Sequence, residues 1–311
     1  MRVFFYIALS CFLCSCTVSK STPYSDIFAS KVVTLDDTQQ LQLLLDSPED
    51  LIVIPYREHP WITEPLFLRT TNKRIVFEEG CTIIAKKGQF LDTGDSLLSI
   101  HDSHNIEIEG YNAILQMHKK DYMSAPYEKG QWRHGISLRR SSNIRISGLE
   151  IRETGGDGVY IGQNRGDPVC ENIELIDLKL VENYRQGVSV ISVRNFLIDN
   201  CTVSGTSGTL PMAGIDFEPN SDLYGFTGCV VRNCVFLNNK GPGILIYLKK
   251  LTPNHPFTDI KIQDCISKKN NFSINVQVPK GVNGKVIISN CDFSWFKLIR
   301  TPKTFMVEFN N

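Results

Sequence analysis

Two carboxylates, Asp216 and Glu218, alternate with apolar residues in the stretch AGIDFEPN at 213–220. A β-strand places alternate side chains on one face, so both acids are expected to point the same way, with α-carbons about 6.5–7 Å apart. Hydrolysis of a glycosidic bond uses two carboxyl groups, about 5–5.5 Å apart in retaining enzymes and about 6.5–9.5 Å apart in inverting ones. The pair is therefore a candidate for glycoside hydrolysis, and its spacing is compatible with inversion.

A repeat of short strands positions these acids. Clear copies of the repeat start at Asn143, Asn172, Asn195 and Gly228, weaker ones start at Asn105, Asp259 and Lys285, and the starts are 23 to 38 residues apart. Within each copy, apolar residues alternate in short runs separated by Gly, Asn and Asp, which predicts strands and turns rather than helix. Repeats of this size built from short strands are typical of a parallel β-helix, whose coils stack about 4.8 Å apart.

A glycine in each coil gives the strand after it a common register. The first residue after each glycine is expected to point inward and the second outward. The outer face then gathers His134, Arg139, Asp157, Tyr160, Asp216, Glu218 and Tyr247. The turn residues expected at its rim are Glu153, Tyr184 and Arg185. Acids, arginines and aromatic rings on one face predict a sugar-binding groove, and a solvated strand face is the alternative. The coil of Asp216 carries four extra residues, and its GTSGT segment (205–209) is expected to overhang the groove.

The roles of the acids follow from this arrangement as a hypothesis. Glu218 is expected to be the general acid, and either Asp216 or Asp157 the base. Asp157 lies two coils from Asp216, on the order of 10 Å along the axis, and is the third catalytic candidate. The remaining residues of the face and rim are expected to bind substrate.

Two other function classes stay open at this point. A polysaccharide lyase or uronate epimerase needs a base and a cation that neutralises a carboxylate; the candidates are Arg139, Arg185, His134 and Tyr160. Asp157 and Asp216 would then hold Ca²⁺, and otherwise no metal or cofactor is expected. The other class is a non-catalytic glycan-binding surface protein or structural solenoid.

Cysteines recur at one position of the repeat. Cys201, Cys234, Cys265 and Cys291 each come six residues after their anchors, and earlier coils place Leu178, Leu149 and Tyr111 in that slot. Stacked side chains point in parallel rather than toward each other, so we expect an inward stack of free thiols rather than disulfides. The asparagines that start the coils are expected to be turn residues, hydrogen-bonded from coil to coil.

The first residues have the pattern of an export signal. A single Arg precedes an apolar run from Val3 to Leu13, and the following Cys14-Ser15-Cys16 resembles the end of a bacterial lipobox. We expect a signal peptide at 1–15, a lipid on Cys16, a tether at 16–31, and a β-helix domain with its caps at 32–311. This predicts a lipid-anchored protein of the outer membrane or periplasm, the alternative being a plain secretory signal. The formal net charge of zero, from 33 basic and 33 acidic residues, argues against nucleic acid as a partner.

Several motifs together resemble a known superfamily. A short helix at 36–46 that would cap the solenoid, the strand LIVIP (51–55) and N-I-x-I coils are similar to the pectin-lyase-like superfamily over about residues 32–300. The stretches around AGIDFEPN and NCVFLNNKGPGI resemble right-handed β-helix repeat proteins of bacterial lipoproteins and phage tailspikes. The resemblance implies an all-β, single-stranded right-handed parallel β-helix with an N-terminal capping helix, and a carbohydrate-active or carbohydrate-binding protein. GGDG (155–158) puts Asp157 where the polygalacturonase branch has an Asp, whereas the other motifs of that branch are missing.

Overall fold

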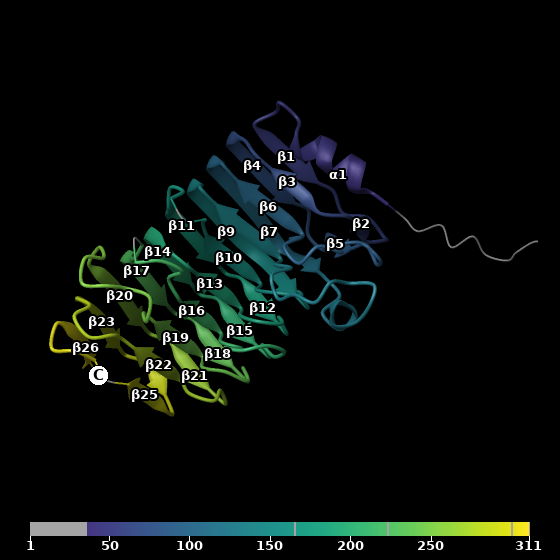
Figure 1. Ribbon diagram of the computed structural model, residues 1–311. Coiled ribbons are helices and arrows are strands. Elements are labelled where there is room, and N and C mark those ends of the chain that lie inside the picture. Colours follow the sequence, from purple (N-terminus) through teal and green to yellow (C-terminus); the bar gives the residue numbers. More distant parts are fainter. Residues whose placement is uncertain (1–35, 165, 223, 300, 311) are drawn as a thin grey trace, which may run out of the picture. The chain divides into compact units, whose positions relative to one another are not determined.

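The computed structural model describes residues 36–164, 166–222, 224–299 and 301–310 (Figure 1). The predicted signal peptide, Cys16 and the tether lie outside these residues. All the described residues belong to one compact unit. Among them, no helix combines the length and the apolar character that a membrane span requires.

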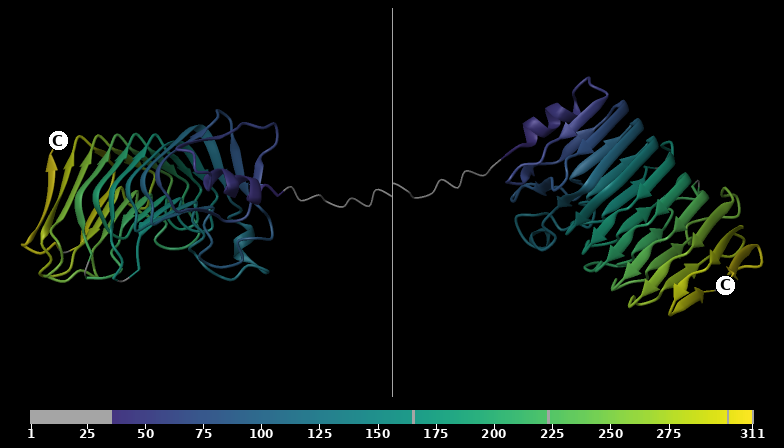
Figure 2. Two further views of the ribbon diagram at one scale, coloured as in Figure 1. Left: turned by 90° about the horizontal axis from the view of Figure 1, so that it is seen from above. Right: turned by 180° about the vertical axis from the view of Figure 1, so that it is seen from behind.

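Parallel strands stack coil upon coil, with up to three strands in each coil (Figures 1 and 2). The first strands are β1 (Leu51–Ile54), β4 (Thr71–Phe77), β7 (His104–Gln116), β9 (Ser142–Arg152), β11 (Cys170–Ile176), β14 (Val193–Asp199), β17 (Phe226–Arg232), β20 (Thr258–Gln263), β23 (Gly284–Ser289) and β26 (Phe305–Asn310). The second strands, in the same sheet, are β2 (Trp61–Thr63), β5 (Thr82–Ala85), β12 (Lys179–Val181), β15 (Thr202–Ser204), β18 (Val235–Leu237), β21 (Ile266–Lys268) and β24 (Asp292–Phe293), while β7 and β9 run through both positions.

The third strands form a separate sheet of nine strands, which we call the third-strand sheet. It consists of β3 (Leu66–Leu68), β6 (Leu98–His101), β8 (Ile136–Arg139), β10 (Val159–Gly162), β13 (Val188–Val190), β16 (Ile215–Phe217), β19 (Ile244–Tyr247), β22 (Ile274–Gln277) and β25 (Phe296–Ile299). Its inward side chains alternate with outward ones, so Ile215 and Phe217 lie in the core as predicted.

Two stacked rows hold successive coils together. The side-chain amide of each anchor asparagine donates to the preceding one, from Asn105 onto Asn72 through to Asn195 onto Asn172, at 2.7–2.9 Å. The cysteines of the described residues are free thiols, which confirms the unbonded stack. The prediction for Tyr111 was wrong, because this residue is 53% exposed rather than inward. The strand β7 bulges between Glu109 and Ala113, and Ala113 instead pairs with Leu149.

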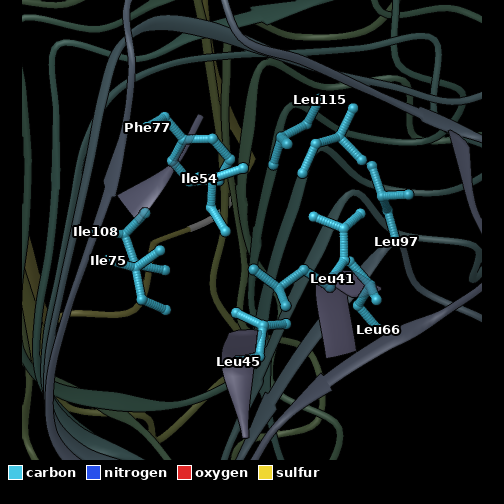
Figure 3. Close-up of a pocket in the computed structure, with 11 residues that line it drawn as sticks. Leu41, Leu45, Ile54, Leu66, Ile75, Phe77, Leu97, Ile108 and Leu115 are labelled. Atoms are coloured by element: carbon cyan, nitrogen blue, oxygen red, sulfur yellow. The ribbon is translucent and has the colours of Figure 1, made fainter. Parts of the chain in front are cut away.

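The helix α1 (Thr38–Leu45) covers the first coils, as the leucine-rich stretch predicts. Leu41 and Leu45 point into the apolar interior, where they face the inward residues of β1, β4 and β7 (Figure 3). The space left among these side chains is only about 20 Å³, so this end of the core is closely packed. The carboxylate of Asp37 pairs with Arg57 and accepts from the backbone of Ile62, rather than capping the helix. A short 3₁₀ turn, η2 (Asp121–Met123), lies in the long connection between β7 and β8.

Candidate functional site

The third-strand sheet carries the predicted site on its outer side. One residue of each strand stacks in a single outward row, and from coil to coil this row is Phe67, Ser99, Ser137, Tyr160, Ser189, Asp216, Leu245, Asn275 and Lys297. The register of the sequence repeat is therefore right. The outward acids were expected to face solvent, but Asp216 and Asp157 are both 0% exposed. Ser189 and Leu245 flank Asp216 in the row, and the Gln186 side chain reaches it from the coil before.

Close packing at each coil's glycine brings the residues before it next to this row. A Cβ on Gly187 would lie 2.1 Å from a methyl carbon of Val203 and 2.6 Å from the carbonyl oxygen of Gly214. The coils therefore approach each other at these glycines more closely than any other residue allows. The residues just before the glycines, among them His134, Asp157 and Gln186, are held against the outward row as a result.

The cluster at the site consists of His134, Arg139, Asp157, Tyr160, Arg185, Gln186, Asp216 and Glu218. One end of it is formed by His134, Asp157 and Tyr160. The Nδ1 atom of His134 accepts the backbone N–H of Asp157 at 3.1 Å and lies 3.2 Å from its carboxylate. An accepting Nδ1 places the proton of the neutral ring on Nε2, so the contact with the carboxylate is not an ion pair in that form. The imidazole stacks on the Tyr160 ring with 4.7 Å between centroids, and the guanidinium of Arg139 lies 4.9 Å from the same ring. Burial raises the pKa of Tyr160.

Arg185 contacts two of the three acids. Its guanidinium nitrogens lie 3.5 Å from Asp157 and 3.5 Å from Glu218. The Arg185 side chain is 13% exposed and that of Glu218 is 25% exposed, so both reach solvent while Asp157 does not. Both contacts are longer than the about 2.7–2.9 Å of a close charge-assisted hydrogen bond. Arg185 is thus the link between Asp157 in one coil and Glu218 two coils on.

Asp216 is the most perturbed acid of the cluster. Burial, followed by the negative charge of Glu218, raises the pKa of Asp216 well above its ordinary value. The Gln186 side-chain amide donates to Oδ2 of Asp216 at 2.6 Å, while Oδ1 is buried without a partner. A protonated Asp216 therefore carries its proton on Oδ1. Asp216 in β16 and Glu218 just after it thus differ in environment, one buried and one in contact with solvent, as suits a general acid and a general base.

A hollow of about 600 Å³, the Glu218 hollow, adjoins the cluster. Arg185, Glu218 and Tyr247 line it together with Lys240 and Lys297. Residues 210–212 supply part of its wall, whereas none of residues 205–209, the segment expected to overhang the groove, lines it. The ammonium group of Lys249 lies 4.8 Å from the centroid of the Tyr247 ring. The lining combines three cations, one carboxylate and the aromatic rings of Tyr247 and Phe272.

Two of the predicted rim residues lie apart from the cluster. In the described residues no side-chain contact joins Glu153 to it; its backbone bonds to Val181 and Lys119. Tyr184 packs against the loop at Gly208, where an added Cβ would lie 2.1 Å from its ring. Gln186, Lys240 and Lys297 belong to the site although the sequence did not single them out. Gln186 had a signal, since it occupies the row of His134 and Asp157, but the two lysines had none.

The two residues expected to hold Ca²⁺ have the wrong surroundings for that ion. Ca²⁺ takes six to eight oxygen ligands. The carboxylate of Asp157 instead faces nitrogen groups, with the backbone N–H of Gln186 at 3.1 Å and Arg185 at 3.5 Å. Asp216 accepts from an amide N–H. Across the described parts of the chain, no set of three or more His, Cys, Asp or Glu side chains is arranged to hold a metal ion. The groups around Asp157 and Asp216 therefore do not fit a Ca²⁺ site.

The family model of the right handed beta helix region matches residues 128–296, more than half of the chain. The chain belongs to this family. The match confirms the predicted class, a right-handed parallel β-helix with a pectin-lyase-like fold. It also covers every residue of the cluster and of the Glu218 hollow except Lys297.

Individual relatives are distant. YclG of Bacillus subtilis (strain 168), described as uncharacterized, is 26% identical over 134 residues, which are 40% of this chain and 23% of that protein. The tailspike protein gp49 of Acinetobacter baumannii bacteriophage Fri1, a capsular polysaccharide depolymerase, matches with a TM-score of 0.54 and 13% identity over 90% of this chain and 56% of that chain. A polygalacturonase from Erwinia carotovora ssp. carotovora matches with a TM-score of 0.51 and 14% identity, over 86% of this chain and 94% of that one. The chain thus spans about a quarter of YclG and just over half of the tailspike, and the likenesses to these two solved structures show the fold alone.

Proposed function

We propose that this β-helix protein is a polysaccharide glycoside hydrolase in which Asp216 is the general acid and Glu218 the general base. The observation that carries the proposal is a buried carboxyl group of raised pKa beside a second carboxylate that reaches solvent in a hollow. The roles are the reverse of those expected from the sequence, because Asp216 rather than Glu218 is the buried acid. The polysaccharide-processing names of the tailspike and the polygalacturonase support a polysaccharide ligand.

The proposed reaction assigns one proton transfer to each of the two acids. Asp216 donates the proton on Oδ1 to the glycosidic oxygen as the bond from that oxygen to the sugar breaks. Glu218 removes a proton from the water that attacks the anomeric carbon. The proposal requires Arg185, held by two contacts of 3.5 Å, to move aside when the substrate enters so that Asp216 becomes accessible. Exchange with solvent then returns the proton to Asp216.

A screen of the purified protein against neutral and acidic polysaccharides tests the reaction type. Hydrolysis creates new reducing ends without ultraviolet absorbance. Equal production of reducing ends and absorbing unsaturated products would mean eliminative cleavage and would overturn the proposal. Binding of a polysaccharide without any product would place the protein in the non-catalytic class instead.

A polysaccharide lyase or uronate epimerase is the second candidate, favoured by one observation. Arg185, Lys240 and Lys297 put three cations around the Glu218 hollow, and such cations neutralise the carboxylate of an acidic sugar. Tyr160 and His134, which would supply the base, are buried and stacked on each other. Proton abstraction from a bound sugar by either ring therefore has less structural support than hydrolysis by the carboxyl pair.

The proposal includes export and anchoring through Cys16. Fractionation of cells that make the full chain or a Cys16→Ser variant tests it. The parent protein is expected in the membrane fraction and the variant in the soluble extracytoplasmic fraction. The same distribution for both chains would contradict the lipid anchor.

A further inference from the structure

A second hollow lies where turns follow the strands of the third-strand sheet. Its volume is about 320 Å³. The residues that line it are Gln163, Asn220, Ser221, Asp222, Tyr224 and Lys250. Gln163 directly follows β10, the segment from Asn220 follows β16, and Lys250 follows β19. We call it the Gln163 hollow, and none of its residues belongs to the Glu218 hollow.

Unequal turns create this space. In the coil between β10 and β16, only Ile191 and Ser192 separate β13 from β14. The longer turns on either side meet through the Tyr224 hydroxyl, which accepts the backbone N–H of Gly166 at 2.6 Å and donates to the carbonyl oxygen of Asn164 at 2.9 Å. These two hydrogen bonds hold the turns in place, so the hollow is a built feature of the fold.

The environment of the Gln163 side chain indicates that the hollow binds a ligand. Gln163 is only 3% exposed, yet neither the nitrogen nor the oxygen of its side-chain amide has a hydrogen-bond partner. Buried amides without partners are rare because desolvating them is unfavourable. This amide offers one acceptor and two donor hydrogens to whatever occupies the hollow.

The rest of the lining indicates the chemistry of that ligand. Asp222 and Lys250 contribute one charge of each sign, so the hollow has no net charge. Asn220 adds a second amide. Sugar hydroxyls both donate and accept hydrogen bonds, which suits a lining of amides and opposite charges. The Glu218 hollow differs, because cations outnumber its single acid.

We propose that the Gln163 hollow binds a neutral sugar unit of a glycan, and this inference rests on the proposed function in taking a glycan as the ligand. Gln163 and Glu218 each follow a strand of the third-strand sheet, two coils apart, which is about 10 Å along the axis. An oligosaccharide is long enough to occupy both hollows. The site thus selects chains in which a neutral unit accompanies the unit that is cleaved.

Nuclear magnetic resonance titration with D-glucose, D-galactose, D-mannose, L-rhamnose and N-acetyl-D-glucosamine tests the site. At least one of these sugars is expected to bind, and Gln163→Leu to weaken its binding by about tenfold or more. Gln263→Leu is the matched control, with unchanged sugar binding expected, because Gln263 also ends a strand but lines neither hollow. Binding of none of the five sugars, or binding that Gln163→Leu leaves unchanged, would overturn the proposal.

The stability of the variant separates this role from a structural one. Gln163→Leu removes two unpartnered buried polar atoms, so its melting temperature is expected to equal or exceed that of the parent. Should that variant fail to fold, Lys250→Met at the exposed rim of the hollow decides instead, with weaker sugar binding expected and unchanged binding contradicting the proposal. Sugar binding that depends on Gln163 without polysaccharide cleavage would refute the hydrolase and leave this site standing. Polysaccharide cleavage without sugar binding that depends on Gln163 would refute this site and leave the hydrolase standing.

Discussion

Asp216 occupies a position that favours its neutral form. It lies on the outward row of the sheet, yet neighbouring coils and the Gln186 side chain exclude solvent from it. Desolvation penalises the charged form of a carboxyl group, and the nearby charge of Glu218 penalises it further. Asp216 thereby holds its proton more tightly than an ordinary carboxyl group does, which suits it to the role of a proton donor.

The stability of the protein is expected to depend on pH through Asp216. Its pKa in the folded chain is raised above 3.8, the ordinary value that applies to the unfolded chain. Above about pH 4 the unfolded chain therefore binds fewer protons than the folded chain, and stability falls as pH rises toward the folded pKa. Asp216→Asn removes this contribution and is expected to raise the urea midpoint at pH 7 but not at pH 3. An equal change at both pH values would contradict the assignment.

Arg185 is expected to shift the pH profile of turnover. Its positive charge lowers the pKa of Asp216, opposing burial and Glu218. Arg185→Gln therefore raises the pKa of Asp216 further, and an acid that must be protonated then works to higher pH. The alkaline limb of the kcat/KM profile is expected to move upward in pH. Arg194→Gln is the control, since Arg194 pairs with Glu171 at an exposed position of the first strands. A limb that stays in place would show that Asp216 is not the acid.

At the scale of elements, strand register could be predicted from the sequence and burial could not. The alternation around Gly187 and Gly214 placed Ile215 and Phe217 inward and both acids outward, because a strand has a period of two. Whether an outward residue meets solvent depends instead on side chains from neighbouring coils and on turn lengths. Tyr184 shows the same limit, because its ring packs against a loop whose path the repeat does not specify.

The loop that borders the Glu218 hollow depends on Gly208. Its φ of +151° is unfavourable for other residues, and an added Cβ would lie 2.1 Å from the ring and 2.8 Å from the backbone oxygen of Tyr184. Gly208→Ala is expected to cost about 1–3 kcal/mol of stability and to lower turnover as the wall of residues 210–212 shifts. Gly94→Ala, with nothing within 4 Å of the added carbon, is the control in urea denaturation. Equal midpoints for both variants would mean that the loop tolerates a side chain.

For the whole molecule, stability depends on covering the open end of the stack. The leucine-rich pattern at 36–46 predicted the capping helix, and the repeat predicted the stacked coils, because both are local patterns. The bulge at Tyr111 and the two lysines of the Glu218 hollow escaped prediction, since insertions and turns have no periodicity.

The cap can be tested with two leucines of the same helix. Leu41 is 1% exposed and packs on the first coils, whereas Leu43 is 64% exposed. Leu41→Ala is expected to lower the free energy of unfolding by about 2–5 kcal/mol because it leaves a cavity. Leu43→Ala is expected to stay close to the parent in the same denaturation series. Similar losses for the two variants would contradict the capping role.

Turnover by Asp216→Asn and Glu218→Gln tests the central claim most directly. The measurement is the rate of reducing-end release from the polysaccharide that the parent protein cleaves, with Arg194→Gln as the control. Each acid variant is expected to lose about 10²- to 10⁴-fold in kcat, the size of a general acid or base contribution, while remaining folded. Full turnover by both acid variants would show that the carboxyl pair does not perform the reaction.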